Sequence, residues 1–78
     1  MIERPICERY SDSVMKIYNK NNMRSALLDF NCMSVYFFRG NRRVIATEHL
    51  NGKTVAEALK LCGTWVNYGT YEESDFAA

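Results

Sequence analysis

Three arginines stand around a Gly-Asn pair in the stretch FFRGNRRVI, near the middle of the chain. Arg39 precedes the pair, and Arg42 and Arg43 follow it. A guanidinium group presents its N–H donors as a planar fork, which binds phosphates or carboxylates through parallel hydrogen bonds. Charged side chains also keep the tip of an ordinary hairpin solvated. The three arginines are therefore candidates for partner binding, with a solvated turn as the simpler alternative.

Aromatic residues stand next to these arginines. Tyr36 and Phe38 would share one face of a strand, because side chains alternate along a strand. Charge beside aromatic rings is typical of surfaces that bind single-stranded nucleic acid by stacking, although three arginines neutralise few phosphates. One hypothesis is thus a small nucleic-acid-binding protein that uses Arg39, Arg42, Arg43 and Lys53 with Tyr36 or Phe38.

A second set of candidates lies near the C-terminus and consists of Trp65, Tyr68, Tyr71, Glu72 and Glu73. Trp and Tyr are enriched at the energetic centres of protein interfaces, because they bury a large area at a low entropic cost. The acidic residues could complement a basic partner. We expect Tyr68 and Tyr71 to be exposed contact residues, whereas Trp65 also fits a place in the core. This segment and the arginines together predict a surface for a protein partner.

The chain offers little for catalysis or metal binding. His49 is the only histidine, and Cys7, Cys32 and Cys62 are far apart, with no C-x-x-C pair. Zinc sites normally bring their ligands in close pairs, and catalytic cysteines need a base within hydrogen-bond reach. A spatial pairing of one cysteine with His49 stays open. We predict no catalytic residue, no metal and no cofactor, and three free thiols with Cys62 buried.

The letters Gly52-Lys53-Thr54 match the end of a phosphate-binding loop. Such a loop needs a glycine five positions before Gly52, and Thr47 stands there instead. Without that glycine the backbone cannot form the nest of N–H groups that holds phosphates. We interpret this stretch as a turn that leads into the N-cap of a helix.

The elements that position these residues are clearest in the second half. Residues 33–38 and 43–50 are rich in β-formers, and Gly40-Asn41 between them tolerates the positive φ of a tight turn, which predicts a hairpin over about 33–50. Thr54 and Glu57 form a capping box, and Gly63 is expected to stop a helix over about 54–62. The apolar face of this helix would consist of Val55, Ala58, Leu59 and Cys62. Residues 65–68 could then add an edge strand.

The first half is more ambiguous. Residues 13–18 (SVMKIY) fit a strand with alternating faces and also a helical turn. Residues 23–30 match the spacing of an amphipathic helix, with Asn22 as its N-cap, and this favours a second helix there. Residues 1–12 would be irregular or a short edge element. The predicted class is α+β, with a small antiparallel sheet around the hairpin and a helix packed on it.

Size and composition predict one folded domain over residues 1–78, with residues 1–10 and 72–78 frayed. The 47% apolar and 24% charged residues are ordinary for a globular chain, and the net charge is only +1. A core this small yields about 3–5 kcal/mol of stability, so docking on a partner or homodimer formation would help it. No apolar run reaches the roughly 20 residues of a membrane span. We expect a cytoplasmic protein without a membrane segment.

In its brevity, its α+β plan and its lack of a catalytic signature, the chain resembles the small proteins that bacteriophages encode to inhibit host machinery, anti-CRISPR proteins among them. This resemblance rests on general style and on no motif. It implies a non-enzymatic protein-binding module, an inhibitor or adaptor that occludes a surface of a larger protein or complex. That is the leading hypothesis from the sequence, and nucleic-acid binding is the alternative.

Overall fold

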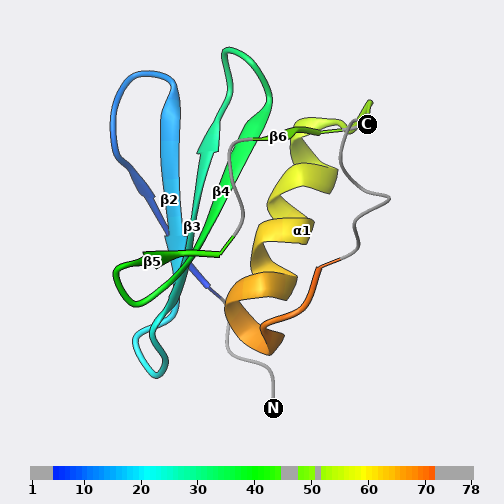
Figure 1. Cartoon of the computed structure of the whole chain (residues 1–78). Coiled ribbons are helices and arrows are strands. Elements are labelled where there is room, and N and C mark those ends of the chain that lie inside the picture. The colour runs from blue at the N-terminus through cyan, green and yellow to red at the C-terminus, as the bar shows by residue number, and fades with distance from the viewer. Residues whose placement is uncertain (1–4, 45–47, 51, 72–78) are drawn as a thin grey trace.

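One antiparallel sheet and one helix make up the described residues of the computed structural model, which are 5–44, 48–50 and 52–71 (Figure 1). The strands are β1 (Ile6–Arg9), β2 (Val14–Tyr18), β3 (Arg24–Asp29), β4 (Ser34–Arg39), β5 (Arg42–Arg43) and β6 (Glu48–His49). β1 to β5 lie side by side in sequence order, and β6 also pairs with β4. The helix, α1 (Val55–Tyr68), packs on one face of this sheet, which we call the inner face. The predicted α+β class is confirmed.

The predicted hairpin is confirmed, and its turn lies at Gly40-Asn41. Arg39 pairs with Arg42, so two residues connect β4 to β5. Gly40 has a φ of 61°, a conformation that glycine adopts without the steric cost of a Cβ atom. The second arm is short, because β5 has only two residues before the chain returns to β4 as β6. Residues 45–47 of the predicted arm lie outside the described residues.

The second helix predicted over residues 23–30 is wrong, because this segment forms β3. β3 pairs antiparallel with β2 on one side and with β4 on the other. Its buried residues, Ala26 and Leu28, are two positions apart, as expected for one face of a strand. A short apolar run fits either periodicity, and here the pairing with two neighbouring strands decides between them. The ambiguous residues 13–18 likewise contain a strand, β2.

The start of α1 is formed as predicted. The side chain of Thr54 accepts a hydrogen bond from the backbone N–H of Glu57, and the Glu57 carboxylate accepts one from the backbone N–H of Thr54 at 3.1 Å. These bonds from Thr54 stabilise the charged carboxylate and lower the pKa of Glu57. The residues just before the helix therefore act as a turn and an N-cap, as the sequence indicates.

The predicted end of this helix at Gly63 is wrong. α1 continues to Tyr68, and Gly69, with a φ of 73°, ends it in the left-handed conformation. Residues 65–68 are therefore helical and do not form the predicted edge strand. A glycine inside a helix costs about 1 kcal/mol relative to alanine, and burial of the apolar side chains that follow it offsets this cost. A Cβ at Gly63 would make an ordinary van der Waals contact with the Pro5 ring, at 3.6 Å, so the site itself does not require glycine.

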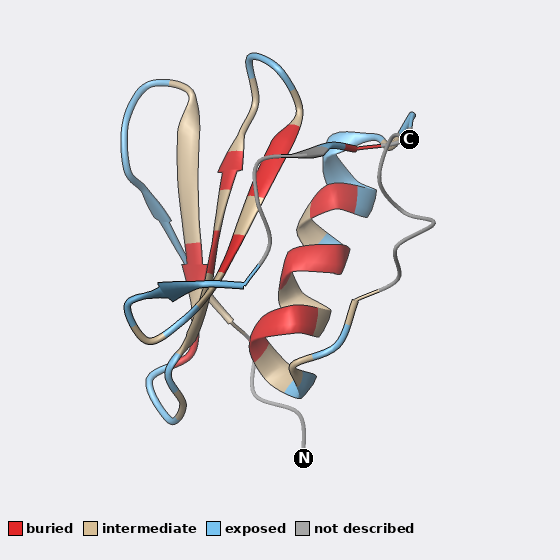
Figure 2. Cartoon of the chain, in the orientation of Figure 1, coloured by how far each residue is buried: buried red, intermediate tan, exposed pale blue. Residues whose placement is uncertain are grey.

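The core lies between α1 and the inner face (Figure 2). Trp65 stacks on Phe37 of β4, with ring centroids 5.1 Å apart and planes 7° from parallel. The indole N–H of Trp65 donates to the backbone carbonyls of Ser25 and Phe38, at 3.1 and 3.2 Å. The buried side chains of α1 are Ala58, Leu61, Cys62, Trp65 and Val66. Val55, which the sequence places on this apolar face, is 47% exposed.

Side chains from another element hold the C-terminal end of α1. The Nε atom of Arg24, on β3, donates to the carbonyls of Trp65 and Val66, at 3.0 and 3.2 Å, and its Nη2 atom donates to the carbonyl of Asn67 at 2.9 Å. The last four carbonyls of a helix lack intrahelical partners, and a cation there is favoured by the helix dipole. Within α1 itself the last turn holds no basic residue, so this cation comes from the sheet.

Replacing Arg24 with methionine should lower the free energy of unfolding by about 2–3 kcal/mol, because half-buried carbonyls lose a charged donor. Urea denaturation followed by Trp65 fluorescence measures this change. The control is Arg42→Met, because Arg42 is exposed in the hairpin and its loss should cost less than about 0.5 kcal/mol. Equal stability of the two variants would contradict the role of Arg24.

Candidate functional site

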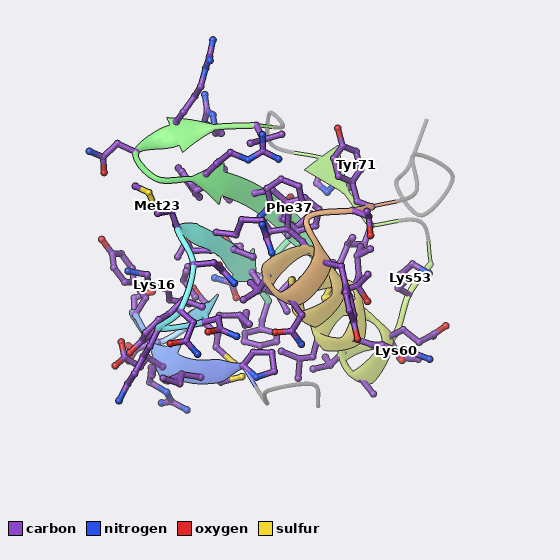
Figure 3. The ribbon with its side chains drawn as sticks, turned by 90° about the horizontal axis from the view of Figure 1, so that it is seen from below. Lys16, Met23, Phe37, Lys53, Lys60 and Tyr71 are labelled. Carbon is purple, nitrogen blue, oxygen red and sulfur yellow. The ribbon has the colours of Figure 1, made fainter. Side chains whose placement is uncertain are left out.

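The face of the sheet opposite the inner face is not covered by a helix in the described part of the chain (Figure 1). Strand register places one set of side chains from β1 to β5 side by side on it, and we call this set the open face. It includes Glu8, Lys16, Tyr18, Ser25, Leu27, Tyr36, Phe38 and Arg43. Its residues on β2, β3 and β4 are half-buried, whereas Glu8 and Arg43 are exposed. In Figure 3, Lys16 lies on the side of the sheet away from α1.

Two cations on the open face lie over aromatic rings. The Arg43 guanidinium carbon is 5.9 Å from the ring centroid of Tyr36, and the Lys16 Nζ atom is 5.3 Å from that of Tyr18. Such contacts contribute about 0.5–1 kcal/mol at exposed sites, enough to favour these positions without fixing them. The open face thus presents ring surfaces with a positive charge directly beside them.

A hydrogen bond orients Tyr18. Its hydroxyl donates to the carboxylate of Glu8 on β1 at 2.9 Å. This bond is the main cause that raises the pKa of Tyr18, and partial desolvation and the charge of Glu8 act in the same direction. The hydrogen bond thus holds the hydroxyl end of Tyr18, while Lys16 lies over the face of its ring.

The three arginines of the hairpin do not form a single cluster. Arg43 belongs to the open face, whereas Arg39 turns to the inner face, with its guanidinium carbon 5.6 Å from the ring centroid of Trp65. Arg42 pairs with Arg39 and is exposed. Alternation along the strands causes this division. Lys53, which the nucleic-acid hypothesis adds to the arginines, lies beyond α1, far from the open face (Figure 3).

The C-terminal candidates are also divided. Trp65 is 1% exposed and belongs to the core, and Tyr71 packs against Phe37 and Trp65, with ring centroids 5.5 and 5.9 Å apart. Tyr68 is 55% exposed. Glu72 and Glu73 lie outside the described residues. Within the described part of the chain, Tyr68 is the member of this set that presents most of its side chain to solvent.

Tyr68 borders a groove of about 470 Å³ between β1 and α1. The lining is mostly apolar and includes Pro5, Cys7, Leu59 and Gly63, and Lys60 is its only charged residue among those that the structure describes. This groove is separate from the open face, because only the former lies beside the helix.

Of the three cysteines, Cys32 is the one that contacts His49, and this contact is made by its backbone carbonyl. The Nδ1 atom of His49 lies 2.8 Å from the backbone carbonyl of Cys32 and 3.4 Å from the hydroxyl of Ser34. A carbonyl only accepts, so Nδ1 carries the proton and cannot serve as a base for the Cys32 thiol. That thiol donates to Ser34 at 3.2 Å instead. No metal-binding group of three ligands exists among the described residues.

Lys16, Tyr18 and Leu27 were not predicted as site residues from the sequence. The alternation in residues 13–18 does place Lys16 and Tyr18 on one face of a strand. It could not show that this face adjoins Tyr36 and Phe38, because that contact depends on β3 lying between β2 and β4. Because residues 23–30 were predicted to form a helix, the strand that connects β2 to β4 was not expected.

No family model, curated protein sequence or solved structure matches the chain. No helix of the described residues is long and apolar enough to cross a membrane.

The three thiols are free, and they should differ in reactivity. Cys7 and Cys32 are exposed, whereas burial is the main cause that raises the pKa of Cys62 to about 12. Because the thiolate is the reactive form, we expect 5,5′-dithiobis(2-nitrobenzoate) at pH 8 to modify two thiols of the folded protein quickly. The third should react only in urea, and Cys62→Ala should keep both fast thiols. Three equal rates would contradict the buried position of Cys62.

Proposed function

We propose that this chain is a non-enzymatic nucleic-acid-binding protein that contacts its ligand with the open face. The observation that carries the proposal is the position of Arg43 and Lys16 over Tyr36 and Tyr18. Nucleic acids present phosphates and flat bases together, and this combination matches cations placed beside aromatic rings. Of Arg39, Arg42 and Arg43, only Arg43 lies on the open face.

The distribution of charge supports the same ligand. Residues 5–44, which form β1 to β5, contain seven basic and three acidic side chains, whereas residues 45–78 contain two basic and five acidic ones. A polyanion would therefore be attracted to the part of the chain that forms β1 to β5. The small net charge of +1 does not oppose binding, because the two halves differ in sign.

The number of cations near the open face limits the electrostatic part of binding. If Lys16 and Arg43 neutralise about two phosphates, the logarithm of the association constant should fall with the logarithm of salt concentration with a slope of about −1.4 for a single strand. This is a weak dependence compared with that of proteins that bind by charge alone. Ring contacts must then supply much of the affinity.

The double variant Lys16→Glu/Arg43→Glu should weaken the binding of a fluorescein-labelled 12-nucleotide oligonucleotide at least tenfold, because it replaces both cations of the open face with like charges. Fluorescence anisotropy at 50 and 200 mM salt measures the affinity and its salt dependence. The control is Lys60→Glu, whose side chain lies on the far side of α1 and should not matter (Figure 3). Unchanged binding by the double variant would contradict the proposed surface.

The groove beside Tyr68 favours a protein partner as a second candidate function. Its apolar lining and the single charge of Lys60 suit an apolar segment that carries an acidic residue. An exposed tyrosine at the border of such a groove is a typical contact residue. In this case the chain would act as an inhibitor or adaptor by covering a surface of a larger protein, in the style of the phage-encoded inhibitors it resembles.

If this second function holds, Tyr68→Ala should abolish the capture of one specific protein from a host lysate, whereas Tyr36→Ala should retain it. Truncation of a tyrosine at the centre of an interface typically costs 2 kcal/mol or more, about thirtyfold in affinity. Capture with the two immobilised variants, followed by mass spectrometry, makes the comparison. A protein captured equally by both variants would not support the groove.

A further inference from the structure

The open face carries three aromatic rings, those of Tyr18, Tyr36 and Phe38, at positions that are not adjacent to one another. Tyr36 and Phe38 are two positions apart on β4, about 6.6 Å at the usual rise of a strand. Phe38 and Tyr18 lie two strands apart, about 9.6 Å, with Ser25 between them in the same row. Three rings therefore offer separate flat surfaces on one face.

Bases can reach such surfaces only when they are not paired in a duplex. In a duplex each base is stacked between its neighbours and presents only its edges in the grooves. Reading those edges takes a helix or a two-stranded ribbon that enters a groove. Here α1 lies on the other side of the sheet, and β4 and β5 pair over only two residues. The geometry favours a ligand whose bases are free to turn toward the rings.

The area of the open face also distinguishes between a protein partner and a single strand of nucleic acid. The five strands β1 to β5, about 4.8 Å apart, with five residues at about 3.3 Å each, span roughly 400 Å². A stable protein interface buries about 800 Å² on each partner, so the open face alone is too small for one. A short stretch of single strand needs no such area, because each base stacks on a ring separately.

Building on the proposed function, we infer that the ligand is an unpaired strand of DNA or RNA, and that Tyr18, Tyr36 and Phe38 stack up to three of its bases. A base that stacks on Tyr36 takes the place of the Arg43 guanidinium, which lies over that ring in the free protein. The released guanidinium stays at the edge of the open face and binds a phosphate. Lys16 plays the same part beside Tyr18.

Binding assays with substitutions at one ring distinguish stacking from other contacts. Tyr36→Phe keeps the ring and should bind like the wild type, whereas Tyr36→Leu keeps an apolar side chain without a ring and should bind at least fivefold more weakly. Phe38→Leu should behave like Tyr36→Leu. Tyr68→Ala is the matched control, because it removes an exposed tyrosine outside the open face. Circular dichroism confirms that each variant is folded.

The probes are fluorescein-labelled dT10, rU10 and a 20-base-pair duplex, each measured by anisotropy at 100 mM salt. We expect binding of dT10 or rU10 at least tenfold tighter than that of the duplex, and the two single strands compared with each other identify the preferred sugar. Equal binding of duplex and single strands overturns this inference and leaves the proposed function standing. No binding of any probe overturns both. Equal binding by Tyr36→Phe and Tyr36→Leu overturns stacking alone.

Discussion

The stack of Trp65 on Phe37 is the contact on which the rest of the structure depends. It seats α1 on the sheet, and the indole N–H ties the helix to β3 and β4 through the carbonyls of Ser25 and Phe38. Arg24 then satisfies the last carbonyls of the same helix. With Phe37 facing α1, alternation along β4 turns Tyr36 and Phe38 to the opposite side. The core and the open face thus follow from one choice of register.

The same alternation decides which charged residues can act together. Arg43 shares the open face with Phe38, whereas Arg39 shares the inner face with Phe37. A slip of one residue in the pairing would exchange the two sets, which burial of Phe37 prevents. The hairpin is thus a structural turn whose tip directs one arginine to the proposed binding surface. Of the other two hairpin arginines, Arg39 lies over the ring of Trp65 and Arg42 is exposed.

The sequence predicted those elements whose signals are local. The Gly40-Asn41 turn and the capping box of Thr54 and Glu57 are formed as expected, because each depends on residues within a few positions. Elements that depend on distant contacts were missed. Gly63 would end an isolated helix, but packing of Trp65 and its capping by Arg24, 41 residues away, extend α1. The sequence predicted that Tyr36 and Phe38 share a strand face, but not that Tyr18 lies on the same side of the sheet. That arrangement depends on β3, which lies between β2 and β4.

Chemical-shift mapping by NMR during titration with unlabelled dT10 tests the central claim most directly. If bases stack on the open face, ring resonances of Tyr18, Tyr36 and Phe38 should move upfield, together with changes at the Arg43 side chain. The indole of Trp65, which is buried on the inner face, should shift little. Shifts confined to Tyr68, Leu59 and the groove beside them, or no shifts at all, would contradict the account.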